Sequence, residues 1–412
     1  NDYAKGAPNK ERFKQNYLYP QLKELFSNYG EIGMLWLDGT WDGEWTSEDG
    51  KQLEAYIRTL QPSVVLNNRS GYKPPQPKLD FHVENAYSYI FAGDYISPEG
   101  EVPPTGLPGI DWETCQTMQL PNNWGYNRLV GFRPFNDLLR QLVDVTSKGG
   151  NILLNIGPDA DGSILPQARS CLEKFADWMK VNSVSIHGTT ASPFPQLPFD
   201  GRCTRKGSTL FLHVFQWPGN GKINVPIANK VTQAFLLADK DTPLKSQSGD
   251  GGATILIPST APDPIDSVIA VTFSGELKVL PSPSSISRGK PVEVSGEWAG
   301  REDHLSKNHV NDGNYDTIWA GPENSRDGWV QIDLGKDHLV SSLLIDEGPY
   351  QRCQEFEVRA QVAGEWKTIT SGTVIGKQNR MIIDPVKARY FRLVILRAND
   401  VPTISAFELF GM

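Results

Sequence analysis

The stretch Ile32-Gly33-Met34-Leu35-Trp36-Leu37-Asp38-Gly39 has the features of a buried strand that ends in a carboxylate. Its apolar run is short, and the Asp-Gly pair that closes it predicts a turn. A parallel β/α barrel places its catalytic groups at the carboxyl ends of such strands. Asp38 is therefore a candidate catalytic group, although a solvated Asp that opens a turn would give the same pattern.

Helices and strands are predicted to alternate around this stretch. Leu18, Leu22, Leu25, Phe26 and Tyr29 have helical spacing, and Gly30 is expected to end that helix. Further helices are expected at about 48–60, around 135–143 and at about 166–181, with short apolar strands at 64–67 and 151–156. This alternation predicts βα units and a parallel sheet covered by helices.

The pattern changes after about residue 190, where helical periodicity gives way to short strands such as 209–215 and 234–237. A Pro/Ser linker at 280–285 then precedes a third, all-β stretch. The expected organisation is a catalytic β/α barrel over residues 1–190, a β-sandwich over 191–279 and an all-β module over 286–412.

The composition of the 412 residues excludes several function classes. The net charge is −8 with no basic cluster, which argues against nucleic acid as a partner, and no apolar run is long enough for a transmembrane helix. The 4 cysteines are scattered and contain no CxxC pair, so neither a zinc site nor a dense disulfide framework is indicated. The 11 Trp and 13 Tyr suit a ligand such as a sugar, although most could belong to the core.

Hydrolysis of a glycosidic bond needs a second carboxyl group besides Asp38. The long segment 72–127 supplies Glu99 and Glu113, with Glu84 as a weaker choice. Spacing alone does not choose among them.

Seven short runs in residues 17–164 resemble, in the same order, motifs of glycoside hydrolase family 29, the retaining α-L-fucosidases. They are Gln21–Leu25 with Tyr29-Gly30, Trp36–Gly39, Asn68-Arg69, Ser97-Pro98-Glu99, Trp112–Cys115, Trp124–Tyr126 and Gly150–Pro158. The resemblance implies an Asp38 nucleophile and a Glu99 general acid/base, with Glu113 as the alternative acid/base.

The same resemblance assigns substrate-binding roles to Arg69 on the fucose side of the pocket and to Trp124 near the sugar's methyl group. Trp36 and Glu113 complete the predicted substrate-binding set. The implied reaction is a double displacement that requires no cofactor, with the two carboxyl groups roughly 5 to 5.5 Å apart.

The upstream motifs by which this family grips fucose hydroxyls, a His-Trp-Gly and a Lys-His-His-Asp-Gly run, are absent from this sequence. We therefore expect only the C-terminal part of the barrel here. Because a half barrel leaves an open core and unpaired strand edges, an N-terminal barrel fragment is an expected partner.

The last stretch resembles an F5/8 type C, or discoidin-like, module, through Val310–Trp319, Trp329–Gly335, Arg389–Leu393 and Phe407–Gly411. Such modules are β jelly rolls that often bind galactose-type sugars, and many hold a structural calcium ion. The resemblance implies Asp312, Thr317 and Glu408 as calcium ligands. A turn without an ion is the alternative.

The expected activity is removal of terminal α-L-fucose from a fucosylated oligosaccharide or glycoconjugate. The alternative is a non-catalytic protein that binds fucose or galactose-type sugars. A third possibility, a glycosidase for another sugar, is disfavoured by the apolar Trp124, which suits the 6-deoxy methyl group of fucose. The substrate class implies an extracellular, periplasmic or other secretory location.

Overall fold

A computed structural model describes residues 7–39, 44–74, 92–103, 105–120, 123–249, 251–281, 284–300, 305–315, 317–348, 350–376 and 378–411. The chain divides into two compact units. The N-terminal unit lies within residues 1–133 and 148–169, and the C-terminal unit within 134–147 and 170–412.

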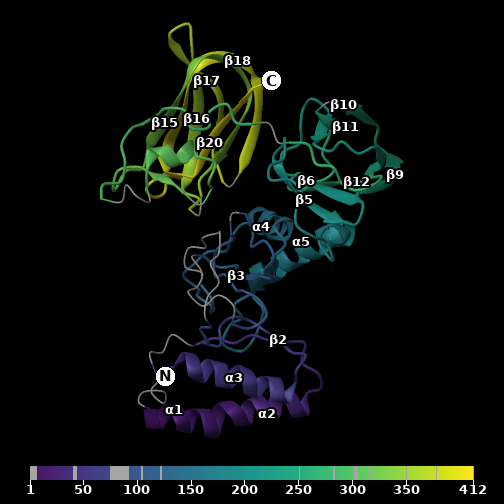
Figure 1. Ribbon diagram of the computed structural model, residues 1–412, viewed down its shortest axis with the longest axis vertical. Helices are drawn as coiled ribbons and strands as arrows, with labels where there is room; N and C mark the ends of the chain where they lie inside the picture. Colours follow the sequence, from purple (N-terminus) through teal and green to yellow (C-terminus); the bar gives the residue numbers. More distant parts are fainter. Residues whose placement is uncertain are drawn as a thin grey trace. The chain divides into compact units, whose positions relative to one another are not determined.

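The N-terminal unit begins with a series of helices (Figure 1). They are α1 (Ala7–Phe13), a π-helical turn (Lys14–Leu18), α2 (Tyr19–Asn28) and α3 (Ser47–Leu60). Leu22 of α2 and Leu53 and Ile57 of α3 are buried together, because each recurs at helical spacing on one face. The helices predicted at 18–29 and 48–60 are confirmed, and Gly30 follows α2 with a φ of 82°.

Short parallel strands follow one another through this unit. Strand β1 (Met34–Leu35) pairs with β2 (Val65–Leu66), and β3 (Glu113–Thr117) pairs with β4 (Asn151–Asn155). Parallel bridges from Asn67 to Tyr95 and from Ile96 to Trp112 connect the two pairs. Five successive segments therefore run in the same direction, as the alternation of helices and strands predicted.

The first part of the C-terminal unit contains helices and two antiparallel sheets. The helices are α4 (Phe135–Ser147), a 3₁₀ turn (Ser183–Ser185) and α5, whose full range is Pro166–Asn182. One sheet has the order β5 (Gly201–Lys206), β6 (Thr209–Val214), β12 (Ser267–Phe273), β8 (Val231–Leu236) and β9 (Asp239–Pro243). The other has the order β10 (Ser246–Gly249), β11 (Gly252–Leu256) and β7 (Lys222–Val225).

Alternation along β6 explains how these layers pack. Leu210 and Leu212 point into a core shared with Val225 and Ile255 of the smaller sheet, whereas Phe211 points toward the helices. The five-stranded sheet therefore has one face on a second sheet and the other on α4 and α5.

The last part of the C-terminal unit is all-β, with one extensive core. Its main sheet contains β13 (Val292–Val294), β15 (Gly328–Asp346), β16 (Cys353–Val362), β17 (Glu365–Gly372), β18 (Asn379–Ala398) and β20 (Ala406–Gly411). A 3₁₀ turn (Lys307–Asn311) and the pair β14 (Trp319–Ala320) with β19 (Thr403–Ile404) accompany it. The all-β character that the sequence predicts after residue 286 is confirmed.

No helix in the described part of the chain is both long enough and apolar enough to cross a membrane. The residue limits predicted for the three domains, 1–190, 191–279 and 286–412, stay predictions.

Candidate active site

Asp38 lies directly after the end of β1, and the side chain of Asn67 holds the backbone beside it. The Asn67 amide accepts a hydrogen bond from Leu37 N at 2.9 Å and donates one to Leu37 O at 2.8 Å. Asn67 is completely buried, whereas the Asp38 side chain is 43% exposed. The strand end is therefore fixed while its carboxylate remains accessible to a ligand.

Glu99 lies at the end of the segment that passes between β2 and β3. The side-chain oxygen of the buried Asn68 accepts hydrogen bonds from Ser97 N at 3.0 Å and Ser97 Oγ at 2.9 Å. Glu99 itself forms a parallel bridge with Cys115 of β3. Neighbouring asparagines thus fix the two segments that carry the candidate carboxylates.

Arg69 brings the two carboxylates together. Its Nη1 donates to Asp38 Oδ1 at 3.1 Å and to Glu99 Oε2 at 2.8 Å. Because both oxygens are bound by one nitrogen, Asp38 Oδ1 and Glu99 Oε2 are at most about 6 Å apart, a bound compatible with the roughly 5 to 5.5 Å between carboxyl groups that the resemblance implies.

The guanidinium of Arg69 is itself held by Ser97 and Trp36. Its Nε and Nη2 donate to Ser97 Oγ and Ser97 O, both at 3.0 Å. Its carbon lies 4.6 Å from the ring centre of Trp36, which is a cation–π distance. Trp36, which was predicted to bind substrate, therefore contacts the same guanidinium that binds the two carboxylates.

Cys115 lies under the same guanidinium. Arg69 Nη2 is 3.7 Å from its sulfur, and the thiol donates to Pro98 O at 3.6 Å. Burial raises the pKa of Cys115 to about 11, although the Arg69 charge opposes the shift. The thiol is therefore neutral at physiological pH and has the character of a packing group.

Glu113, the alternative acid/base, has a different partner. Its Oε1 accepts a hydrogen bond from the Tyr95 hydroxyl at 3.5 Å. Burial raises the pKa of Glu113, and the hydrogen bond from Tyr95 opposes this only in part. Among the described contacts, Arg69 binds both Asp38 and Glu99, whereas the hydrogen bond of Glu113 is to Tyr95, so these contacts pair Asp38 with Glu99.

Trp124 lies in the loop after β3, with 38% of its surface exposed. Its backbone oxygen accepts a hydrogen bond from Asn155 Nδ2, at the end of β4, at 2.7 Å. The accessible ring can therefore contact a ligand, while its backbone is tied to a strand end. Glu84, the weaker candidate, lies outside the described residues.

The segment around Arg69 is further supported by α3. Glu54 of α3 accepts hydrogen bonds from Ser70 Oγ and from Gly93 N, the latter at 3.2 Å. Trp45 Nε1 donates to Ser70 O at 2.8 Å. Gly93 has a φ of 67°, and a Cβ there would lie 2.3 Å from Asn67 O, so this close approach needs glycine.

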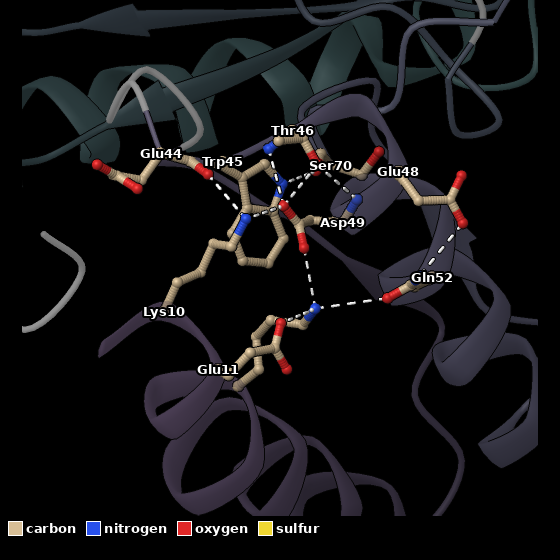
Figure 2. Close-up of polar contacts among 10 residues, drawn as sticks. Lys10, Glu11, Glu44, Trp45, Thr46, Glu48, Asp49, Gln52 and Ser70 are labelled. Atoms are coloured by element: carbon tan, nitrogen blue, oxygen red, sulfur yellow. Dashed lines mark hydrogen bonds and ion pairs between the residues drawn. The ribbon is translucent and has the colours of Figure 1, made fainter. Parts of the chain in front are cut away.

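A buried ion cluster fixes the beginning of α3 (Figure 2). Thr46 and Asp49 form a capping box, and the Asp49 carboxylate also accepts from Lys10 Nζ at 2.7 Å and Lys14 Nζ at 2.9 Å. Burial opposes ionisation of Asp49, but the hydrogen bonds from Lys10, Thr46 and Lys14 hold its pKa well below the usual range. The first helices and α3 are thereby joined around one carboxylate.

The predicted calcium ligands lie in the all-β module of the C-terminal unit. Thr317 Oγ1 donates to Asp312 Oδ2 at 2.8 Å. Glu408 is buried, and its Oε1 accepts a hydrogen bond from Arg288 Nη2 at 2.7 Å. The described residues contain no cluster of three or more His, Cys, Asp or Glu side chains suited to a metal ion. Binding of calcium stays a prediction.

Asn67, Asn68, Ser97 and Cys115 contact the site and were not predicted as site residues. Their side chains hold backbone or guanidinium groups on neighbouring strands, and such contacts leave no periodic pattern in a sequence. The one available signal was position, because Asn67 and Asn68 directly precede Arg69 at the end of an apolar strand.

Two family models match this chain: alpha-L-fucosidase over residues 1–184 and F5/8 type C domain over residues 291–409. The tissue alpha-L-fucosidase of Macaca fascicularis is 27% identical over 282 residues, which cover 64% of this chain and 56% of that protein. This chain spans about half the length of the curated relatives it matches.

Solved structures give the same result. Alpha-L-fucosidase isoenzyme 1 from Paenibacillus thiaminolyticus matches with a TM-score of 0.54 and 31% identity, over 66% of each chain. The alpha-L-fucosidase from Vibrio sp. strain EJY3 matches in fold with a TM-score of 0.58 and 20% identity, over 97% of this chain and 70% of that one. The chain therefore matches the alpha-L-fucosidase family, glycoside hydrolase family 29, over residues 1–184 and an F5/8 type C domain over residues 291–409.

Proposed function

We propose that this protein is a retaining exo-α-L-fucosidase that releases terminal α-L-fucose from glycans or oligosaccharides. The main support is the contact of Asp38 and Glu99 with the same nitrogen of Arg69, which limits the distance between their oxygens to about 6 Å. At that separation one carboxylate can attack the anomeric carbon directly while the other reaches the leaving oxygen. An inverting enzyme needs a wider gap to hold a water molecule.

In the first step Asp38 attacks the anomeric carbon as Glu99 donates its proton to the departing glycosidic oxygen. A fucosyl ester on Asp38 results. In the second step Glu99 takes a proton from water, the water oxygen attacks the same carbon, and the Asp38 carboxylate leaves. Arg69 maintains the spacing of the two groups in both steps, and Trp124 offers an apolar surface to the methyl group of fucose.

The parallel strands of the N-terminal unit are proposed to form part of a β/α barrel, followed by a β-sandwich and a jelly-roll module. Among the described residues, β1 and β4 are each paired along one edge only. Further βα units, expected as an N-terminal barrel fragment, would pair with these edges and complete the pocket. The substrate class suggests a secretory location.

Hydrolysis of an aryl α-L-fucoside, followed by proton NMR of the first sugar released, tests this function. The proposal predicts α-fucose as the initial product, because two displacements retain configuration. Initial β-fucose would contradict the retaining mechanism. Binding of fucosylated oligosaccharides without turnover would favour the alternative, a non-catalytic carbohydrate-binding protein.

A further inference from the structure

The F5/8 type C module contains a buried carboxylate whose hydrogen-bond partners are already in place. Arg288 Nη2 donates to Glu408 Oε1 at 2.7 Å. Glu408 Oε2 accepts from the Tyr315 hydroxyl and from Gln196 Nε2, each at 3.3 Å. The Glu408 side chain is 1% exposed, so these groups replace the water that an ionised carboxylate would otherwise need.

The other predicted calcium ligands, Asp312 and Thr317, also have hydrogen-bond partners already. Asp312 Oδ1 accepts from Asn314 N at 2.7 Å, and Asp312 Oδ2 accepts from Thr317 Oγ1 at 2.8 Å. Gly313 has a φ of 84°, and a Cβ at this position would lie 2.3 Å from Arg288 Cζ. The guanidinium of Arg288 therefore packs directly on the backbone of this loop while it binds Glu408.

These contacts do not fit a divalent ion. Calcium binds 6–8 oxygens at about 2.3–2.6 Å, whereas Glu408 here faces a fixed cation. The hydrogen bond to Glu408 is the largest of the influences that raise the pKa of Arg288, and Asp312 and Tyr315 add to it. A second guanidinium, that of the buried Arg380, also acts on Glu408 electrostatically.

We propose that Arg288 serves as the built-in cation of this module, joining the 312–317 loop to Glu408 and removing the need for calcium. An arginine suits this role because its planar charge is permanent and presents several donors. The inference is independent of the proposed fucosidase activity, since none of these residues belongs to the candidate active site.

Hydrogen–deuterium exchange of the full chain tests the inference locally. The protein is freed of metal with EDTA, and peptides that cover 305–315 and 406–411 are compared with and without millimolar calcium. We expect identical exchange in both conditions. Slower exchange of either segment in calcium would overturn the proposal, whatever happens elsewhere in the chain.

Variants test the role of the guanidinium. In Arg288→Met the buried Glu408 loses its hydrogen-bonded cation, and we expect protection of 406–411 to fall at least about tenfold. Arg326→Met is the matched control, because Arg326 is 51% exposed, against 52% for Arg288, but its partner Asp400 is 52% exposed. Equal protection in the two variants would contradict the proposal, and if Arg288→Met does not fold, the calcium comparison on the unaltered chain still decides.

Discussion

Three consecutive side chains connect the strand ends of the candidate site. Asn67 holds the backbone beside Asp38, Asn68 holds the segment that leads to Glu99, and Arg69 contacts both carboxylates. Asp38 could be proposed from the sequence, because an acidic residue after an apolar strand is a recognisable pattern, whereas Glu99 was chosen among its alternatives only through the family resemblance. The asparagines could not, because their role depends on which strand end lies opposite each of them.

Asn67→Ala should lower both stability and activity. It removes the partners of Leu37 N and Leu37 O, and each backbone group left without one costs about 1–3 kcal/mol. Because Asp38 is the next residue, we expect kcat for an aryl fucoside to fall, as measured by steady-state kinetics.

Asn229→Ala is the matched control for that change. The buried Asn229 donates to Ser274 O and Glu276 O and accepts from Lys278 N, but in the C-terminal unit. It should cost similar stability and leave kcat unchanged. Equal kcat losses in both variants would show that Asn67 acts only through general stability.

Glu99→Gln should lower kcat/KM by at least about a hundredfold, because a general acid/base contributes that much or more. Glu113→Gln is its control, since Glu113 contacts Tyr95 and lies on the neighbouring strand. It should lower kcat/KM much less than Glu99→Gln does, because Glu113 is predicted to contact the substrate without transferring a proton. The reverse order of effects would move the acid/base role to Glu113.

Glu113→Gln should also stabilise the protein at neutral pH. Burial raises the pKa of Glu113 in the folded state, which means that folding favours its neutral form. The stability that Glu113 contributes is fully present below its unfolded pKa of about 4.3 and is lost as pH rises through the folded pKa, so that at neutral pH the buried charge only destabilises the fold. The gain in urea midpoint should therefore shrink as pH falls toward about 4. Glu173→Gln, an exposed change on α5, should give no such pH-dependent difference.

Among the helices of the N-terminal unit, sequence and structure agree where an apolar stripe is present and differ where it is absent. Helices α2 and α3 have such stripes and were predicted. The residues of α1 and the π-helical turn are largely polar, and their contact with α3 runs through Lys10 and Lys14 instead. Strand β3 was missed for a similar reason, because its sequence Glu-Thr-Cys-Gln-Thr is polar although it is largely buried.

Asp49→Ala tests how strongly the ion cluster of Figure 2 fixes these helices. Removing one partner of a buried ion cluster costs about 3–5 kcal/mol, because the remaining charges stay buried. Loss of the Asp49 carboxylate leaves Lys14, which is 3% exposed, without that partner. Urea unfolding followed by helix signal should show the loss.

Glu48→Ala is the control for that experiment. Glu48 is the exposed neighbour of Asp49 in the same first turn, and its loss should cost less than about 1 kcal/mol. The low folded pKa of Asp49 also means that its contribution is present above about pH 4 and disappears as pH falls further. Equal losses for both variants would exclude a special role for the cluster.

At the scale of the whole molecule, the chain forms two compact units, and the helix α4 belongs to the second. The sequence showed where helical periodicity ends but gave no sign that α4 packs with the β layers. Part of this packing is a buried ion pair in which Arg202 Nε of β5 lies 2.5 Å from Asp144 Oδ1 of α4. A contact between residues 58 positions apart is not visible in local periodicity.

Asp144→Ala should therefore weaken the C-terminal unit selectively. We expect faster hydrogen exchange in α4, β5 and β6, since Arg202 would keep a buried charge without this carboxylate. Exchange in α2 and α3 should remain unchanged. Uniform acceleration over both units would contradict the division of the chain into two units.

The proposed retaining mechanism requires that Asp38 becomes covalently fucosylated during turnover. Incubation with a 2-fluoro-fucosyl fluoride, which slows the second displacement, followed by peptide mapping by mass spectrometry, tests it most directly. We expect one 2-fluorofucosyl adduct, on the peptide that contains Asp38, and no adduct in Asp38→Ala. An adduct on Glu99 or Glu113, or turnover that persists in Asp38→Ala, would contradict it.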